Sequence, residues 1–194
     1  GAFKTQAYLA EKKSGDFCDV PRHPVWESSS SLTLAAPSSR QYYTLELLKC
    51  QRLTSGIHSW SVLMLETSEW ICVGVASTEH EVIHDTLLGC QVGGWALSSD
   101  GTVTHNNSQE QATGLKFQKN STVTFILDLT GSGTLSGVVD DKQPPTLLFS
   151  DMCSAFEGGK ETCGFVPAVE LYPSDKVKFL GFERSDDYEG HALM

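Results

Sequence analysis

Residues 122–139, TVTFILDLTGSGTLSGVV, contain the pattern that decides the fold. Two strand-like runs, 122–129 and 134–139, flank the tetrapeptide Thr130-Gly131-Ser132-Gly133. Short turns of Gly and Ser between such runs are typical of β-hairpins. We therefore expect an antiparallel hairpin here.

The same kind of pattern recurs on both sides of this hairpin. Asp100-Gly101 separates the runs 95–97 and 102–104 and predicts a second hairpin, because Asp-Gly between strands is a strong turn signal. Further short runs with strand character occur at 43–47, 59–65, 70–76, 165–171 and 177–182. Many short strands at intervals of about ten residues indicate an antiparallel sandwich or barrel, so the fold class is all-β.

Helix is expected only in short pieces, near the N-terminus and in the 78–88 connection. In that connection Thr78 and Glu81 form a capping-box pattern, and Gly89 could end the helix. Without long helical stretches, no parallel βαβ architecture is available. We divide the chain into an extension at 1–31, a β-sandwich domain at 32–183 and a polar tail at 184–194.

Composition and charge exclude several function classes. The chain has 194 residues, 40% of them hydrophobic and 20% charged, which is typical of a single globular domain. The formal net charge of −10, with no basic cluster beyond Lys12-Lys13, argues against nucleic acid and anionic lipid as partners. No apolar run approaches the roughly 20 residues of a membrane-spanning helix. Because the chain opens with Gly1, we expect it to be part of a larger multidomain protein.

The six cysteines are widely spaced, and none forms a Cys-x-x-Cys pair. Zinc-finger and thioredoxin-like sites are therefore not indicated, and a chain of this length does not need disulfides. We expect reduced thiols and a cytoplasmic, intracellular location. The glycosylation triplets at Asn106 and Asn120 argue weakly the other way.

The segment His80-Glu81-Val82-Ile83-His84 matches the HExxH signature of zinc hydrolases. In that chemistry two histidines four residues apart on a helix bind Zn²⁺, and the glutamate activates the bound water. Here the candidate helix is short, Leu87 replaces the glycine of the extended signature, and no second helix offers a third ligand. We interpret the segment as an exposed connection and expect no metal. With no nucleophile elbow and no phosphate-binding loop either, we expect neither a cofactor nor an enzyme.

Five blocks of sequence resemble the SPRY domain family. The segment 56–62, GIHSWSV, is similar to its G-x-H-x-W-x-V stretch, and 70–75, WICVGV, to its W-x-V-G-V strand. GWAL at 94–97 with His105-Asn106, the hairpin 123–136, and FVPAV at 165–169 resemble the later blocks in the same order. Two departures stand out: Ser61 in the usual W-E-V triplet, and a long connection from Cys153 to Cys163.

The resemblance implies a bent antiparallel β-sandwich of the concanavalin-like jelly-roll type, whose loops at one end bind peptide segments of other proteins. The large apolar residues on its strands form the structural core: Trp60, Trp70, Trp95, Leu127 and Phe165. The partner-binding loops would contain Arg40, Arg52, Thr78, His80, His84, Thr86, Tyr172 and Pro173.

The leading hypothesis is a non-enzymatic protein–protein interaction module that binds a short peptide, as a substrate-recruiting domain of a ubiquitin ligase or on a scaffold protein. The net charge favours a basic segment. The alternative is a carbohydrate-binding, lectin-like sandwich. It would need an exposed aromatic platform beside acidic groups, which Trp26, or Tyr172 with Asp175, could provide. The zinc hydrolase through His80, Glu81 and His84 ranks third.

Overall fold

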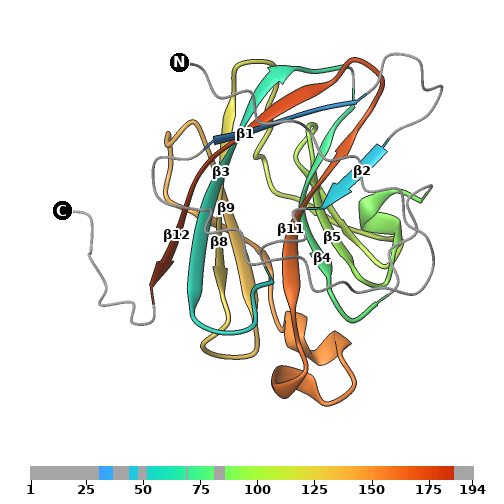
Figure 1. Ribbon diagram of the computed structural model, residues 1–194, viewed down its shortest axis with the longest axis vertical. Coiled ribbons are helices and arrows are strands. Elements are labelled where there is room, and N and C mark those ends of the chain that lie inside the picture. Colours follow the sequence, from blue (N-terminus) through green and yellow to red (C-terminus); the bar gives the residue numbers. More distant parts are fainter. Residues whose placement is uncertain (1–30, 37–43, 48–51, 69, 81–85, 186–194) are drawn as a thin grey trace.

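The structure is a computed structural model that describes residues 31–36, 44–47, 52–68, 70–80 and 86–185. These residues form two antiparallel sheets that face each other (Figure 1). The first sheet has the spatial order β1 (Ser31–Ala35), β12 (Lys176–Ser185), β3 (Ile57–Glu66), β8 (Thr122–Asp128), β9 (Thr134–Val139) and β10 (Thr146–Phe149). The second has the order β2 (Thr44–Leu47), β11 (Phe165–Leu171), β4 (Cys72–Ser77), β5 (Gly94–Ser98), β6 (Thr102–His105) and β7 (Ser108–Ala112). The expected all-β antiparallel sandwich is confirmed.

Both predicted hairpins are present. β8 pairs with β9 from Val123↔Val139 to Asp128↔Thr134, and β5 pairs with β6 around the Asp100-Gly101 turn. At Gly101 the backbone φ is +89°, a left-handed conformation that glycine adopts without steric cost. Strands β7 and β10 were not among the expectations, because SQEQA has no apolar alternation and TLLF follows two prolines.

The interior follows from the alternation of side chains along the strands. On β8 every second residue, Val123, Phe125 and Leu127, is buried, and the residues between them are half-buried. The ring of Trp60 stacks on Phe125 with a centroid distance of 5.5 Å. Four of the five predicted core residues, Trp60, Trp95, Leu127 and Phe165, are buried in this way.

Trp70 is not a core residue, contrary to the sequence-based expectation. Its side chain is 41% exposed, whereas the neighbouring Ile71 is fully buried in the interior cluster. β4 begins only at Cys72, and alternation places Trp70 on the same side of the backbone as Cys72, which is the outer side of the sheet. The first residue of the apolar run 70–76, Trp70, therefore lies outside the interior, and the second, Ile71, is its first interior residue.

The outer face of the second sheet is covered by a short connection. The 3-10 helix η1 (Leu88–Cys90) places Leu88 on a second apolar cluster of small side chains: Cys72, Ala76, Ala96, Val166 and Ala168. The predicted helix at 78–88 lies partly outside the described residues. Its described ends are a bend at Thr78–His80 and the start of η1 at Leu88, so neither end contains α-helix.

The long connection between Cys153 and Cys163 also folds into single turns. It contains η2 (Met152–Ala155) and η3 (Gly159–Glu161), which lie at the lower end of the sandwich in Figure 1. Within the described part of the chain, no helix is long and apolar enough to span a bilayer.

Candidate partner-binding surface

The start of β11 brings two predicted binding connections together. Leu53 and Phe165 exchange backbone hydrogen bonds of 2.8 and 2.9 Å, and the Thr78 N–H donates to the carbonyl of Gly164 at 2.8 Å. The connections around Arg52 and Thr78, 26 residues apart in sequence, therefore meet at one end of the sandwich. This end carries three of the predicted site residues: Arg52, Thr78 and His80.

Arg52 and Glu79 form an exposed ion pair at this end. The guanidinium Nη2 of Arg52 donates to Oε1 of Glu79, which also accepts from the hydroxyl of Thr78 at 3.1 Å. Gly164 leaves the space for this arrangement, because a Cβ there would lie 2.4 Å from Thr78 Oγ1. The two charged side chains are 55% and 42% exposed, so the pair orients these groups but adds at most about 1 kcal/mol of stability.

The imidazole of His80 is held in place by two neighbours. Its Nδ1 is 2.9 Å from the Ser77 hydroxyl, and its backbone N–H donates to the same oxygen at 3.1 Å. The ring meets the edge of Phe156 at a centroid distance of 5.5 Å. Among the described residues no group of three or more metal-ligating side chains is close enough to hold an ion. Glu81 and His84 of the HExxH segment lie outside the described residues.

A series of aromatic rings in contact with one another extends from His80 through Phe156 and Trp95 to His105. Trp95 stacks on His105 at 4.4 Å with an interplanar angle of 7°, and on Phe156 at 6.3 Å with 8°. The carbonyl of Gly94 lies 2.8 Å from Nδ1 of His105. Because a carbonyl only accepts, the proton of this hydrogen bond is on Nδ1.

An open cavity of about 320 Å³ lies beside this aromatic wall. Its other side is formed by β10 and η2, and Leu147 there is 58% exposed although it is a large apolar residue. β10 is irregular at this point, since its register against β9 shifts between Leu147 and Phe149. The lining includes Trp95, His105, Leu147, Asp151, Ser154 and Ala155.

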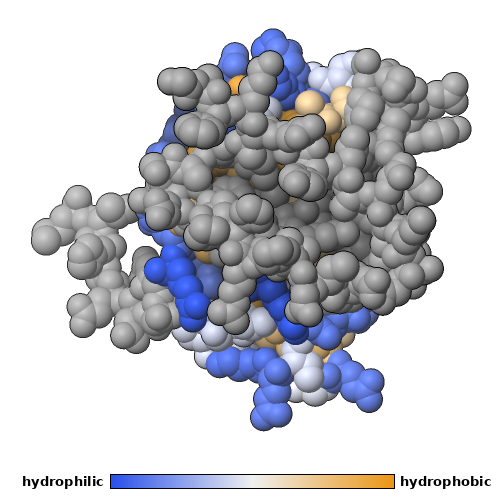
Figure 2. All heavy atoms as spheres, viewed as in Figure 1, coloured by the Kyte–Doolittle hydropathy of each residue, from blue (hydrophilic) through white to orange (hydrophobic). Residues whose placement is uncertain are grey.

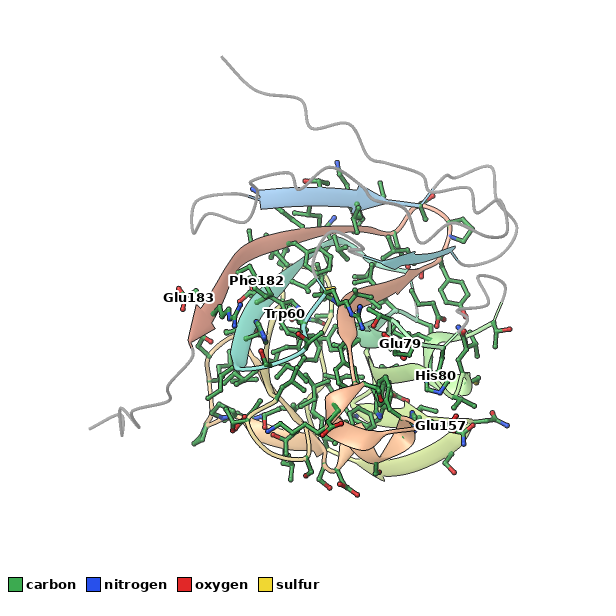
Figure 3. All side chains as sticks on the ribbon, turned by 60° about the horizontal axis from the view of Figure 1, so that its bottom comes forward. Trp60, Glu79, His80, Glu157, Phe182 and Glu183 are labelled. Atoms are coloured by element: carbon green, nitrogen blue, oxygen red, sulfur yellow. The ribbon has the colours of Figure 1, made fainter. Side chains whose placement is uncertain are left out.

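The rim of this region is acidic. Asp151, Glu157 and Glu161 are exposed on the connection that contains η2 and η3, and Glu79 is exposed beside them. The basic side chains of this rim are already engaged: Arg52 with Glu79, and Lys160 through its Nζ with the carbonyl of Thr130. Glu79, His80 and Glu157 lie on the same side of the sandwich in Figure 3. In Figure 2 the lower edge, where η2 and η3 lie in Figure 1, is mostly hydrophilic. We call this region the η2–η3 surface; it comprises Arg52, Thr78, Glu79, His80, the cavity lining and residues 150–162.

Tyr172 and Pro173 lie at the opposite end of β11. Gly164 precedes this strand and Tyr172 follows it, so its seven residues, about 23 Å at 3.3 Å each, separate the two ends. The structure therefore does not bring Tyr172 and Pro173 to the η2–η3 surface. Sequence reasoning could not see this, because it placed both segments in loops without fixing the direction of the strand between them.

Asp175, the acidic partner proposed for Tyr172 in the carbohydrate hypothesis, has a structural role. It is buried, and its carboxylate accepts hydrogen bonds from the backbone N–H groups of Ser68 and Tyr172 and from the Ser68 hydroxyl. A carboxylate engaged in this way is not available to sugar hydroxyls. Trp26, the other predicted platform, lies outside the described residues.

Thr86 belongs to the covering connection of the second sheet. Its carbonyl accepts a 2.9 Å hydrogen bond from the Gln91 side chain, and two residues later the Leu88 N–H donates to Oε2 of Glu170 at 2.8 Å. Glu170 is fully buried on β11, and its Oε1 has no hydrogen-bond partner among the described residues. Burial raises the pKa of this carboxyl, and the Leu88 hydrogen bond opposes part of the rise. Arg40 and His84 lie outside the described residues.

Sequence reasoning missed several residues of the η2–η3 surface. The sequence-based prediction placed none of three residues on a binding surface: His105, Phe156 and Leu147. The length of the insertion was the available signal, because connections that carry function are often longer than the fold requires. Their contacts with Trp95 depend on tertiary structure.

Comparison with known proteins agrees with this architecture. The SPRY domain family model matches residues 57–182, and the chain belongs to this family of protein-interaction modules. The SPRY domain of human HERC1 is similar in structure, with a TM-score of 0.59 and 22% identity over 81% of this chain and 91% of that one. A second human SPRY domain has a TM-score of 0.54 and 13% identity over 76% and 90% of the two chains. No curated protein matches the sequence.

Proposed function

We propose that this chain is a non-enzymatic interaction module that binds a short basic segment of a partner protein on the η2–η3 surface. One apolar side chain of the segment packs on the exposed Leu147 at the edge of the cavity, and its basic side chains face the acidic rim. The open cavity with a large exposed apolar residue at its edge is the observation that carries the proposal.

Two properties of the surface support this assignment. A cavity of about 320 Å³ is within the range of small ligand sites and accommodates a side chain, not a whole domain. The exposed carboxylates of Asp151, Glu157 and Glu161 complement a basic partner, as does the net charge of −10.

A library of random peptides displayed on phage, selected on the immobilised chain, tests the proposal. Selected peptides should contain Lys or Arg beside an apolar residue. Leu147→Asp should weaken their binding at least about tenfold, because it replaces the exposed apolar side chain at the edge of the cavity with a charged one. The matched control is Trp70→Ala, another exposed apolar residue that precedes β4 at the other end of the strand from Thr78. It should change the dissociation constant less than about twofold.

Fluorescence anisotropy with the same labelled peptide compares the variants, and thermal melts confirm that both are folded. If the peptides bind Leu147→Asp as tightly as the wild type, or if only Trp70→Ala weakens their binding, the proposed location of the binding surface is wrong.

We further propose that the bound partner is a substrate delivered to a ubiquitin ligase or held on a scaffold. This role follows from the resemblance to SPRY domains and not from a feature of the surface. It is tested by capturing partners from cells with the wild type and Leu147→Asp, and measuring whether a partner lost in the variant is ubiquitinated only with the wild-type protein.

A further inference from the structure

Two cysteines at the ends of the long connection lie almost in bonding contact. The Sγ atoms of Cys153 and Cys163 are 2.7 Å apart, and both side chains are buried. A disulfide has an S–S distance of about 2.05 Å, so a small movement of either side chain would suffice to form one. The other two described cysteines, Cys72 and Cys90, have different surroundings: Cys72 lies against the hydroxyl of Ser98 at 3.3 Å.

Each cysteine of this pair is anchored to a different sheet. The backbone N–H of Cys153 donates to the carbonyl of Ser132, in the turn between β8 and β9 of the first sheet. Gly133 in that turn fits closely, because a Cβ there would lie 3.0 Å from the Cys153 sulfur. Cys163 is followed directly by Gly164 and β11 of the second sheet. A covalent bond between the two sulfurs would therefore connect the two sheets at the end of the sandwich where η2 and η3 lie.

The connection between the cysteines is folded so that they meet. The Phe156 N–H donates to the Cys153 carbonyl at 3.2 Å, and the Cys163 N–H to the Gly159 carbonyl at 3.1 Å. Gly158 and Gly159 have φ angles of +93° and +62°, which most residues avoid. These turns bring the two thiols together before any bond forms, so the entropy lost on ring closure is small.

We propose that Cys153 and Cys163 are a dithiol–disulfide pair that is oxidised by low-molecular-weight disulfides such as oxidised glutathione. One thiolate attacks a glutathione sulfur and releases one reduced glutathione; the second thiolate displaces the other glutathione from the mixed disulfide. Two thiol protons are lost and two molecules of reduced glutathione form, so electrons and atoms balance. The inference does not depend on the proposed peptide binding.

The surroundings of the pair make this reaction slow but its product stable. Burial, reinforced by the neighbouring thiol, raises the pKa of Cys153 to about 12, so little of the reactive thiolate exists near neutral pH. The rate should therefore rise about tenfold per pH unit between pH 7 and pH 9. The disulfide, once formed, is protected by the same burial and keeps Phe156 and Glu157 on the η2–η3 surface.

Peptide mapping tests the proposal directly. The wild-type chain is incubated in glutathione buffers of increasing oxidising ratio, denatured in excess N-ethylmaleimide and digested with trypsin. Lys160 lies between the two cysteines, so the disulfide links peptide 143–160 to peptide 161–176, each of which contains one cysteine. We expect this linked pair to appear, with a mass 2 Da below that of the two thiols, and to disappear on reduction.

Variants and stability complete the test. Cys153→Ser and Cys163→Ser should each abolish the link, and the control Cys90→Ser should leave it intact. Oxidation should raise the melting temperature of the wild type by roughly 5–10 °C and leave that of Cys153→Ser unchanged. Recovery of both cysteines as separate alkylated peptides at every glutathione ratio would overturn the proposal. So would links from either cysteine mainly to other positions.

Discussion

Glu170 shows how burial changes the chemistry of a single side chain. Glu170 is the one polar residue in the otherwise apolar stretch FVPAVEL of β11, and all seven residues of this strand are buried. In the folded chain η1 covers the outer face of the second sheet, and Glu170 becomes fully buried with one hydrogen bond from Leu88. Within the described part of the chain its second oxygen has no hydrogen-bond partner, which makes the charged form costly.

Replacement of this carboxyl should make stability less dependent on pH. Burial raises the pKa of Glu170 in the folded state above the ordinary value of 4.5, so the folded chain holds this proton to higher pH than the unfolded chain does. Stability from this group is then fully present below pH 4.5 and is lost as the pH rises through the folded pKa. Glu170→Gln keeps an acceptor for Leu88 without the charge, and it should melt higher relative to wild type at pH 7.5 than at pH 5.

Thermal melts of both proteins at pH 5 and pH 7.5 give the difference in melting temperature between Glu170→Gln and wild type at each pH. Titrating groups that the two proteins share affect both melting temperatures equally and cancel in this difference. Glu66→Gln, which removes an exposed carboxylate, is the control. An equal difference between Glu170→Gln and wild type at both pH values would contradict the assignment.

At the scale of elements, the two hairpins were predictable and the covering connection was not. Alternation and turn residues are local properties, so β5–β6 and β8–β9 could be placed from sequence. The role of η1 depends on a cluster of small side chains from β4, β5 and β11, three strands that are distant in sequence. The exposure of Trp70 has the same cause: it begins an apolar run, but its side chain lies on the outer side of the second sheet and not in the interior.

Leu88 should anchor η1 to the sheet. It is fully buried among Cys72, Ala76, Ala96, Val166 and Ala168, so Leu88→Ala removes contacts that small neighbours cannot replace. We expect a loss of about 2–5 kcal/mol in the free energy of unfolding, measured by urea denaturation. The control Leu147→Ala, at an exposed position, should change stability by less than about 0.5 kcal/mol. Similar losses in both variants would mean that η1 does not cover the sheet in solution.

At the scale of the whole molecule, the two ends of the sandwich differ. One end gathers the connections at 52–55 and 78–80 with the 150–162 segment, and has the cavity and the acidic rim. The other end has Asp175, which ties Ser68 and Tyr172 together with hydrogen bonds. The predicted binding residues were divided between these ends. The first has the cavity of about 320 Å³ with the exposed Leu147 in its lining, and the second has a smaller open cavity, of about 220 Å³, lined in part by Thr67, Ser68 and Phe117.

Binding of a basic peptide by so acidic a molecule should depend on salt. With a net charge of −10, the field of the whole chain attracts the peptide before contact. Raising ionic strength from about 0.05 M to about 0.5 M should lower the association rate constant roughly tenfold and change the dissociation rate much less. Stopped-flow fluorescence measures both rates, and an uncharged variant of the peptide is the control. Equal salt effects on charged and uncharged peptides would exclude electrostatic attraction.

The amino-acid sequence alone determined most of the strands, the two hairpins, most of the interior and the family, because alternation and turn chemistry act between residues close together in the chain. Tertiary structure decided which connections meet, which apolar residue stays exposed, which carboxylate is buried and which two thiols touch. These contacts depend on strand pairing across long separations, as when β11 pairs with β4 on one side and β2 on the other. The direction and register of that pairing place Gly164 beside Thr78 and carry Tyr172 to the opposite end.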